Sequence, residues 1–393
     1  MNNFNFYTPT KIVFGSNTED KVGELLQEQQ AKKVLIHYGT GSIIRSGLLA
    51  KVEKCLQEAN IQYILLGGVV PNPLLSKVYE GIELCRKENV DFILAVGGGS
   101  VYDSAKAIAA GLCYDGDVWD FFAGKKTLEK AFPVGGILTL AATGSEMSYA
   151  SVITKDEGLL KRAIHSDCIR PKFSILNPDL TLTLPDYQTF CGCTDITMHT
   201  LERYLNNTTN MEITDSIAEA LIRTVINNSH ALKENPQNKD ARWEIMWSGT
   251  LSHNDLTGCG TNGGDWSTHQ MEHELGGMFD VAHGAGLAAI WGSWARYVVK
   301  VNTHRFEKLA KNVWGLKDEA TPLLTAIKGI EAFENFFKSI DMPINIKELG
   351  YELSDEQINE LADKCTNGET RTIGSVIKLH KSDIIEIYKK ARK

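Results

Sequence analysis

The sequence of 393 residues has few cysteines and no long apolar run. Eight cysteines are too sparse for a disulfide scaffold in so long a chain, which favours reduced thiols. No uncharged apolar run approaches the roughly 18 residues that suggest a membrane span. Residues 1–10 lack the basic and apolar regions of a signal peptide. We therefore expect a cytoplasmic protein without a membrane segment.

An excess of positive charge is also missing. The chain has 41 basic and 49 acidic residues, for a net charge of −8. This balance argues against nucleic acid or an anionic membrane as the main partner. It leaves open a phosphorylated cofactor, which needs only local cations and backbone N–H groups.

Short apolar segments alternate with helical patterns over the first 184 residues. The apolar segments are rich in β-formers and lie at 33–38, 61–66, 91–96 and 135–140. The helical patterns between them lie at 42–59, 74–88 and 100–112. Such alternation predicts a doubly wound, parallel sheet. We expect residues 1–184 to form a Rossmann-like α/β domain.

Strand-like segments almost vanish after Pro185. Long periodic segments follow, at 195–206, 214–234, 240–257, 267–278 and 286–302. About 100–200 residues per domain is typical, so two domains are expected from the length as well. Residues 185–393 are therefore predicted to form an all-α domain.

Three polar, glycine-bearing loops follow predicted strands. Gly97, Gly98, Gly99 and Ser100 open a helix, whose free N–H groups suit a pyrophosphate. This is not the G-x-G-x-x-G fingerprint, and alone it equally fits a tight turn without a ligand. Loops at 38–42 and 139–146 would converge with it at the carboxyl edge of the sheet. A nucleotide site is the leading interpretation, and an unliganded cleft is the alternative.

The loop at 38–42 bears on which nucleotide would bind. In many dinucleotide folds a carboxylate after the second strand binds the ribose of NAD and repels a 2′-phosphate. The stretch Tyr38–Ser42 carries no acid and offers hydroxyl groups. We therefore predict NADP(H) over NAD(H).

Asp195 and His199 have the spacing of metal ligands. Residues four apart share one face of a helix, so both side chains can reach one ion. His269 and His273 repeat the spacing, and His283 follows ten residues later. An aspartate with imidazoles suits Fe²⁺ or Zn²⁺.

Each of these residues also has an ordinary explanation. A lone histidine on a helix is usually a surface or satisfied core residue, and we interpret His37, His165, His230, His253, His304 and His380 in this way. A zinc-protease H-E-x-x-H motif is absent, since Gly277 stands where the second histidine would be. Cys191 and Cys193 are interpreted as small buried residues, because two cysteines cannot complete a tetrahedral site.

Taken in order, these motifs resemble the iron-containing (group III) alcohol dehydrogenases, within the dehydroquinate synthase-like fold. The likeness is nearest to the branch of NADPH-dependent butanol dehydrogenases and broad aldehyde reductases. It runs from about Phe6 to the carboxyl terminus. The segments that carry it are Pro71–Pro73, Val96–Asp103, Thr139–Glu146, Asn177–Asp179, Asp195–His199, Asp265–His269 and His273–Gly284.

The resemblance implies roles for particular residues. Asp195, His199, His269 and His283 would ligate one divalent metal, and His273 would lie near the hydride path as a proton relay or an orienting residue. The cofactor would contact residues of the front domain: Gly39, Thr40, Ser42, Asn72, Gly97, Gly98, Gly99, Ser100, Asp103, Thr139, Thr143, Ser145 and Lys161. Family members also tend to form homodimers through the amino-terminal strand, here roughly 4–14.

The expected function is metal-dependent hydride transfer between NADP(H) and a small primary alcohol or aldehyde, such as butanol or butanal. A dehydroquinate synthase-like lyase and a glycerol dehydrogenase-like polyol dehydrogenase are alternatives on the same fold. The lyase would need many cations around the metal, whereas the sequence near these ligands has Trp266, Met271, Met278 and Phe279 but few cations. Ser148 and 253–255 fall in regions that shape the substrate pocket in relatives. A nucleotide-binding module without enzymatic activity is the third hypothesis, and it would not use four ligands.

Overall fold

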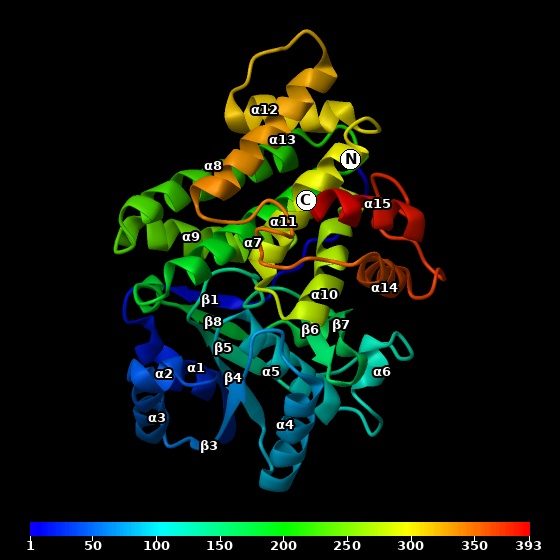
Figure 1. Cartoon of the computed structure of the whole chain (residues 1–393). Helices are drawn as coiled ribbons and strands as arrows, with labels where there is room; N and C mark the ends of the chain where they lie inside the picture. Colours follow the sequence, from blue (N-terminus) through cyan, green and yellow to red (C-terminus); the bar gives the residue numbers. More distant parts are fainter. The chain divides into compact units, whose positions relative to one another are not determined.

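The computed structural model describes all 393 residues, which form two compact units (Figure 1). One unit is Tyr7–Leu184, and the other is Pro185–Lys393 together with Met1–Phe6. The amino-terminal ammonium donates to the carbonyl of Thr209 at 2.7 Å, which ties the first residues to the helical unit. The α/β unit therefore begins at Tyr7 and not at residue 1.

A six-stranded parallel sheet forms the centre of the α/β unit. Its strands, in spatial order, are β1 (Lys11–Phe14), β8 (Phe173–Leu176), β5 (Val134–Leu138), β4 (Phe92–Gly97), β2 (Lys33–Gly39) and β3 (Gln62–Val69). From β2 the chain runs outward to β3 and then returns to β4 on the other side. The strand order therefore reverses between β2 and β4, and open α/β sheets bind ligands at such a point.

Helices cover both faces of this sheet, which explains its continuous apolar strands. Helices α1 (Val22–Glu28) and α3 (Leu48–Glu58) pack with Val34 and Leu94 on one face, while α4 (Leu75–Glu88) and α5 (Gly99–Leu112) pack on the other. Every residue of β4 is buried. The helix expected over 42–59 is divided, because Gly47 adopts a φ of 79° between α2 (Ser42–Arg45) and α3.

Smaller elements complete the α/β unit. An antiparallel hairpin pairs β6 (Ala150–Lys155) with β7 (Leu160–His165). Short helical turns are η1 (Thr18–Lys21), α6 (Trp119–Phe122), η2 (Glu157–Leu159), η3 (Asp167–Ile169) and η4 (Pro178–Thr181). The hairpin was not anticipated from the sequence, where its alternating residues lack a strong apolar signal.

The second unit is built of helices and contains no β-strand. They are α7 (Asp186–Tyr204), α8 (Glu212–Glu234), α9 (Lys239–Ser252), η5 (Leu256–Gly258), α10 (Ser267–Phe279), α11 (His283–Val298), α12 (Thr303–Trp314), α13 (Pro322–Ser339), α14 (Asp355–Thr366) and α15 (Lys381–Ala391). Helix α11 lies at the core, where Trp291 and Trp294 are fully buried. The helix expected over 240–257 ends at Ser252, because the next residue, His253, leaves the helical conformation with a φ of −129°.

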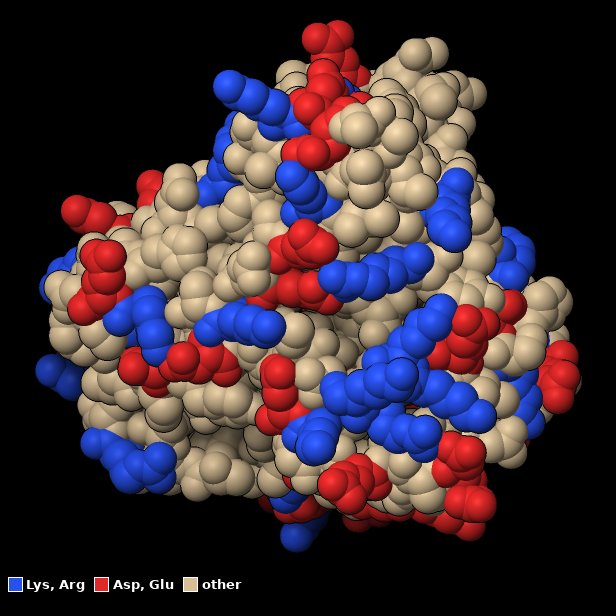
Figure 2. Space-filling view, turned by 45° about the horizontal axis from the view of Figure 1, so that its top comes forward, with Lys and Arg blue, Asp and Glu red and all other residues tan.

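No helix of the chain is long and apolar enough to cross a membrane. On the face drawn in Figure 2, Lys and Arg side chains are interspersed with Asp and Glu, apart from one denser group of basic residues.

Candidate active site

Four side chains that are far apart in the sequence meet within the helical unit. Asp195 and His199 lie one turn apart on α7, His269 lies in the first turn of α10, and His283 begins α11. Helix α11 packs against both α7 and α10 (Figure 1). The Nε2 atoms of His199, His269 and His283 each lie 3.6 Å from Oδ1 of Asp195. One carboxylate oxygen therefore stands at equal distances from three imidazole nitrogens.

The unpaired donor atoms of this cluster fit a divalent metal ion. Oδ1 of Asp195 and Nε2 of His269 are buried and have no hydrogen-bond partner. Buried polar atoms are normally satisfied, so these two require a ligand that the protein itself does not supply. The ligand atoms of Asp195, His199 and His269 all lie within 4.8 Å of one another, so one ion can contact all three. Aspartate with three histidines is also a usual donor set for Zn²⁺ or Fe²⁺.

Two buried glutamates orient the histidines from behind. His269 donates from Nδ1 to Glu202, and His283 donates from Nδ1 to Glu272. Because a carboxylate only accepts, each bond fixes the proton on Nδ1 and turns the Nε2 lone pair inward. Glu202 also accepts the backbone N–H of Thr268 at 2.8 Å and so caps the start of α10.

Sequence reasoning missed both glutamates, although a signal was present. Glu202 follows His199 by three residues, and Glu272 follows His269 by three. Residues three apart are neighbours on a helix. Here, however, Glu202 serves His269 of another helix, a pairing that only the tertiary structure reveals.

Close backbone packing brings α11 to the ligands of α7. A side-chain carbon on Gly284 would overlap the carbonyl oxygen of Cys191, so only glycine allows this approach. Gly286 similarly leaves room for the side chain of Glu272. Cys193 is buried and Cys191 lies in van der Waals contact with Met342. Both cysteines are free and occupy packing positions.

The electrostatics of the cluster favour an ionised aspartate among imidazoles. Burial alone would raise the pKa of Asp195, but the His283 and His269 rings outweigh it and hold the pKa below its ordinary value. Burial, reinforced by His269 and Arg203, lowers the pKa of His199 well below 6.5. Burial also opposes the charge of His269, yet Glu202 and Asp195 raise its pKa to about 9. Protons and a metal ion therefore compete for His269 Nε2.

His273 lies beside the cluster and is not one of its four converging side chains. It is half-buried on α10, with its ring 6.5 Å from that of His269 and 5.8 Å from that of His283. A second group, Glu272, His273 and His283, also brings potential ligand atoms together. The hydrogen bond between Glu272 and His283 accounts for that proximity. Oδ1 of Asp195 and Nε2 of His269, which lie 3.6 Å apart in the four-residue cluster, belong to the first group.

The histidines interpreted as ordinary residues divide into two kinds. His37 is fully buried and bonded to Leu66 and Ser104, and His230 bonds to Ser339. His253 differs, because its ring packs against His199 with centroids 4.2 Å apart. His253 therefore belongs to the surroundings of the four-residue cluster, a position that its sequence context did not indicate.

The predicted cofactor loops lie at the carboxyl ends of neighbouring strands in the α/β unit. Tyr38 of β2 pairs with Val96 of β4, and Gly97 of β4 pairs with Leu138 of β5. The loops that carry Gly39, Thr40 and Ser42, then Gly97 to Ser100, and then Thr139 to Ser145, therefore begin side by side. This edge includes the reversal between β2 and β4.

The start of α5 leaves backbone N–H groups unpaired, as a phosphate site requires. Gly98 is the residue before the helix, and no side chain caps it. A side-chain carbon on Gly99 would overlap Oγ1 of Thr143, whereas one on Gly98 would meet only Leu140, at 3.4 Å. The turn is therefore tightly packed at Gly99 and has free space beside Gly98. Such a helix start can bind an anion through its N–H groups and dipole.

A buried network links Asp103 to the loop after β5. Ser145 donates to Asp103 at 2.6 Å, and the N–H of Val152 donates to its other oxygen at 3.1 Å. Lys106, also buried, donates to the carbonyls of Ser145 at 2.7 Å and Ala150 at 2.9 Å. Burial raises the pKa of Asp103 although Lys106 opposes the shift. This network fixes the position of the loop from 139 to 150.

Asn72 and Lys161 lie near each other at the remaining side of this unit. Asn72 has a left-handed φ of 53° in the loop after β3. The next residue, Pro73, accepts a hydrogen bond from Thr154 of β6, and Thr154 pairs with Lys161 of β7. Lys161 is buried, so its ammonium is held at this position.

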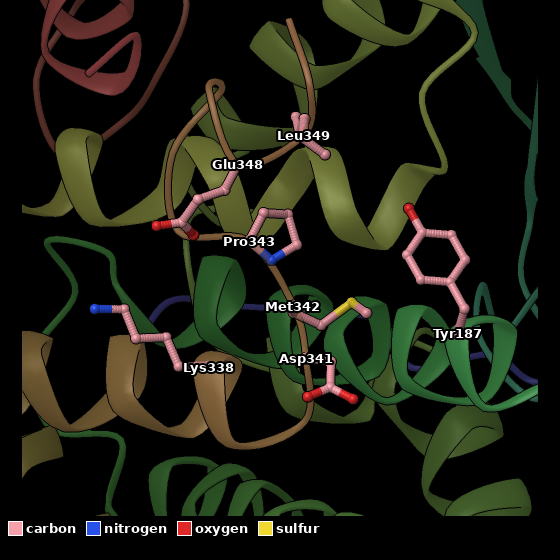
Figure 3. A pocket seen from close by; sticks show the side chains of 7 residues that line it. All are labelled: Tyr187, Lys338, Asp341, Met342, Pro343, Glu348 and Leu349. Carbon is pink, nitrogen blue, oxygen red and sulfur yellow. The ribbon is translucent and has the colours of Figure 1, made fainter.

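A separate hollow of about 580 Å³ opens on the helical unit (Figure 3). It is lined by Tyr187, Lys338, Asp341, Met342, Pro343, Glu348 and Leu349. None of the four converging side chains lines it. Its mixture of apolar, acidic and basic groups defines no particular ligand.

Comparison with known proteins identifies the class. Residues 9–178 match the family model described as iron-containing alcohol dehydrogenase, and residues 189–392 match the C-terminal model of the same family. The chain belongs to the iron-containing alcohol dehydrogenase family. It is a metal-dependent oxidoreductase of the alcohol dehydrogenase and aldehyde reductase type, with a nicotinamide cofactor.

Individual relatives cover most or all of the chain. NADH-dependent butanol dehydrogenase A of Clostridium acetobutylicum is 38% identical over 392 residues, 100% of both chains. The NADPH-dependent aldehyde reductase YqhD of Escherichia coli is 35% identical over 89% of this chain and 90% of its own. The crystal structure of NADH-dependent butanol dehydrogenase A from Thermotoga maritima superposes with a TM-score of 0.96 at 40% identity, covering 100% of this chain and 99% of that one.

Proposed function

We propose that the protein interconverts small primary alcohols and aldehydes, such as butanol and butanal, using NADP(H) and one divalent metal ion. The observation that carries the proposal is that Nε2 of His199, His269 and His283 each lies 3.6 Å from Oδ1 of Asp195. Two of these buried atoms, Oδ1 of Asp195 and Nε2 of His269, have no hydrogen-bond partner. The names of the butanol dehydrogenase relatives support the substrate class.

The four side chains would hold the metal, and Glu202 and Glu272 would keep two of the histidines in the ligating tautomer. When bound, the ion supplies Lewis acidity toward the alcohol or aldehyde oxygen, and the nicotinamide supplies or accepts the hydride. The residues of this chain bind and orient these groups. The family description names iron, and the donor set accepts zinc equally well. Metal analysis of protein from its native host distinguishes the two.

His273 is proposed as the residue that carries a proton to or from the substrate oxygen. Its support is its position beside His269 and His283, half-buried and outside the converging set. The alternative is that it only orients the surrounding water. His273→Ala should keep its metal and lose turnover, with the largest change in the pH profile. Unchanged kinetics would leave His273 with a structural role.

The nucleotide would bind along the loops after β2, β4 and β5. Gly97 to Ser100 would contact the pyrophosphate, Asp103 would lie toward the nicotinamide end, and Lys161 would reach the ribose. The remaining proposed cofactor residues are Gly39, Thr40, Ser42, Asn72, Thr139, Thr143 and Ser145. The support is the free N–H groups at the start of α5 and the reversal of strand order beside it.

The preference for NADP(H) rests on the loop after β2. No acidic residue stands between Tyr38 and Ser42, and the exposed Arg45 places Nη1 3.4 Å from where a side-chain carbon of Gly41 would lie. A guanidinium there suits a 2′-phosphate. Relatives named for NADH and for NADPH are both similar to this chain. Steady-state kinetics with both cofactors decide the point, and a clear preference for NADH would overturn it.

A homodimer and a reducing compartment complete the proposal. Strand β1 pairs only with β8, so its other edge is open. Phe4, Phe6 and Tyr7 before it are about half exposed. A second copy could cover this segment. All eight cysteines are free, as expected of a cytoplasmic protein.

The first experiment is NADPH oxidation at 340 nm with butanal, comparing metal-loaded protein with chelator-treated protein. Metal-dependent oxidation would support the reaction, the cofactor and the metal requirement together. If metal-loaded protein oxidised neither NADPH nor NADH with any short aldehyde, the substrate proposal would be wrong.

A further inference from the structure

His253 occupies the immediate surroundings of the metal-type cluster. It ends α9, and its ring lies 4.2 Å from the ring of His199, centroid to centroid, and 5.8 Å from that of Trp266. The two rings are tilted by 46° to one another, and Nε2 of His199 lies 3.6 Å from Oδ1 of Asp195. A polar group is therefore placed next to the four converging atoms without being one of them.

Arg203 determines which nitrogen of His253 carries the proton. Its Nη2 lies 3.2 Å from Nδ1 of His253. A guanidinium can only donate, so Nδ1 accepts and the proton of a neutral ring resides on Nε2. No group of the chain accepts a hydrogen bond from Nε2. This atom is also not one of the buried side-chain atoms that lack a partner, so it is not sealed from solvent. His253 therefore presents a hydrogen-bond donor that remains accessible.

Arg203 is itself held rigidly. It is buried and donates to the carbonyls of His199 and Ser252, both at 3.2 Å. Its guanidinium also lies over the Trp266 ring, 4.6 Å from the centroid. A donor supported in this way is preorganised, and little entropy is lost when it binds a ligand.

Two strained residues flank this arrangement. Asp255, 3.5 Å from Arg203, has a φ of 76°, and Trp266 has a φ of 63°. Neither is glycine, so each left-handed conformation costs energy that the surrounding contacts must offset. Strain of this kind concentrates at sites that position a functional group. Both outliers here touch the guanidinium that orients His253.

We propose that His253 determines specificity, by donating from Nε2 to a second oxygen of the substrate. The substrates it favours are small aldehydes with a hydroxyl one or two carbons from the carbonyl, and the corresponding diols. Because the His253 ring lies directly against the His199 ring, the two oxygens of the substrate must be close together, which limits the hydroxyl to one or two carbons from the carbonyl. The inference rests on the proposed function, because it assumes that the reacting oxygen lies at the four-residue cluster.

The test uses substrate pairs that differ by one hydroxyl, glycolaldehyde against acetaldehyde and 3-hydroxypropanal against propanal. His253→Leu removes the donor, His253→Gln keeps an N–H donor, and exposed His304→Leu is the control. The preference for the hydroxyaldehyde should fall about ten-fold in His253→Leu, mainly through KM, as expected for one lost hydrogen bond. His253→Gln should recover part of this preference, and metal content measured in each variant separates loss of the donor from loss of the metal site.

An unchanged preference in His253→Leu would overturn the inference. So would a parallel loss on both members of a pair with loss of metal, because His253 would then only support His199. Failure of the proposed function gives a different result: the metal-loaded wild-type protein would reduce no aldehyde of either kind.

Discussion

The two units build their candidate sites from different parts of the chain. In the helical unit the site consists of buried side chains that converge on one point. Two of its histidines are held in place by hydrogen bonds to buried carboxylates. In the α/β unit the site consists mainly of backbone N–H groups and hydroxyls of loops at the edge of a sheet. Side chains at a fixed helical spacing leave a clear mark in the sequence. Backbone groups do not, because almost any residue supplies an N–H.

The difference also predicts how each site responds to mutation. A ligand histidine cannot be replaced, since its nitrogen is the functional atom. A loop glycine is needed only for the space around it. Substitutions in the helical unit should therefore abolish chemistry and leave nucleotide binding intact, and substitutions in the α/β unit should do the reverse.

The largest effect is expected for His269→Ala. Removing the nitrogen leaves Asp195 and two histidines, so metal retention should fail and turnover should fall by about 10³-fold or more. Binding of NADPH, measured by fluorescence titration, should change little, because the loops belong to the other unit. A variant that kept its metal and near-normal turnover would show that His269 is not a ligand.

A smaller effect is expected for Glu202→Gln, which keeps the shape of the side chain and removes its charge. Loss of such a carboxylate partner typically lowers metal affinity by about 10–100-fold. The control is Glu219→Gln, a buried glutamate of the same unit that bonds to Tyr204 and Asn312. Equal metal affinity in the two variants, measured by competition with a chelator, would contradict the role of Glu202.

The glycine pair of the α5 turn tests the other unit. Gly99→Ala should disturb the loop through Thr143 and weaken NADPH binding, with the metal retained. Gly98→Ala has room in the protein, so any loss of binding there reports contact with the nucleotide itself. We expect both to raise Kd, by about ten-fold or more. Normal binding by Gly98→Ala would place the pyrophosphate elsewhere.

The smallest effect concerns the pH dependence of stability in the α/β unit. Burial lowers the pKa of His37 from 6.5 to about 4, although the bond to Leu66 opposes the shift. Between these values the unfolded chain binds a proton that the folded chain does not. Stability should therefore fall as the pH drops below 6.5, by about 2 kcal/mol at pH 5.

His37→Gln should lose less stability between pH 7 and pH 5 in urea denaturation than the wild-type protein does. Exposed His304→Gln is the matched control and should behave like the wild type. An identical loss in all three proteins would show that other groups dominate the acid response.

The sequence alone determined the class of each unit. Short, β-rich apolar segments that alternate with helical patterns predicted the parallel sheet, and the long periodic segments after Pro185 predicted the helical unit. The spacing of Asp195 and His199 placed two potential ligands on one helix face. These conclusions depend on local periodicity, which is a property of the chain itself.

Only the tertiary structure decided which distant groups meet. Three contacts depend on how helices pack. They are the hydrogen bond between Glu202 and His269, the close approach of Gly284 to the backbone of Cys191, and the position of His253 beside His199. The accurate placement of one ligand near another follows from this packing of helices, and no spacing within a single segment encodes it. For the same reason, the sequence indicated only an ordinary histidine at position 253. Its packing beside His199, which the tertiary structure shows, makes it a candidate for determining specificity.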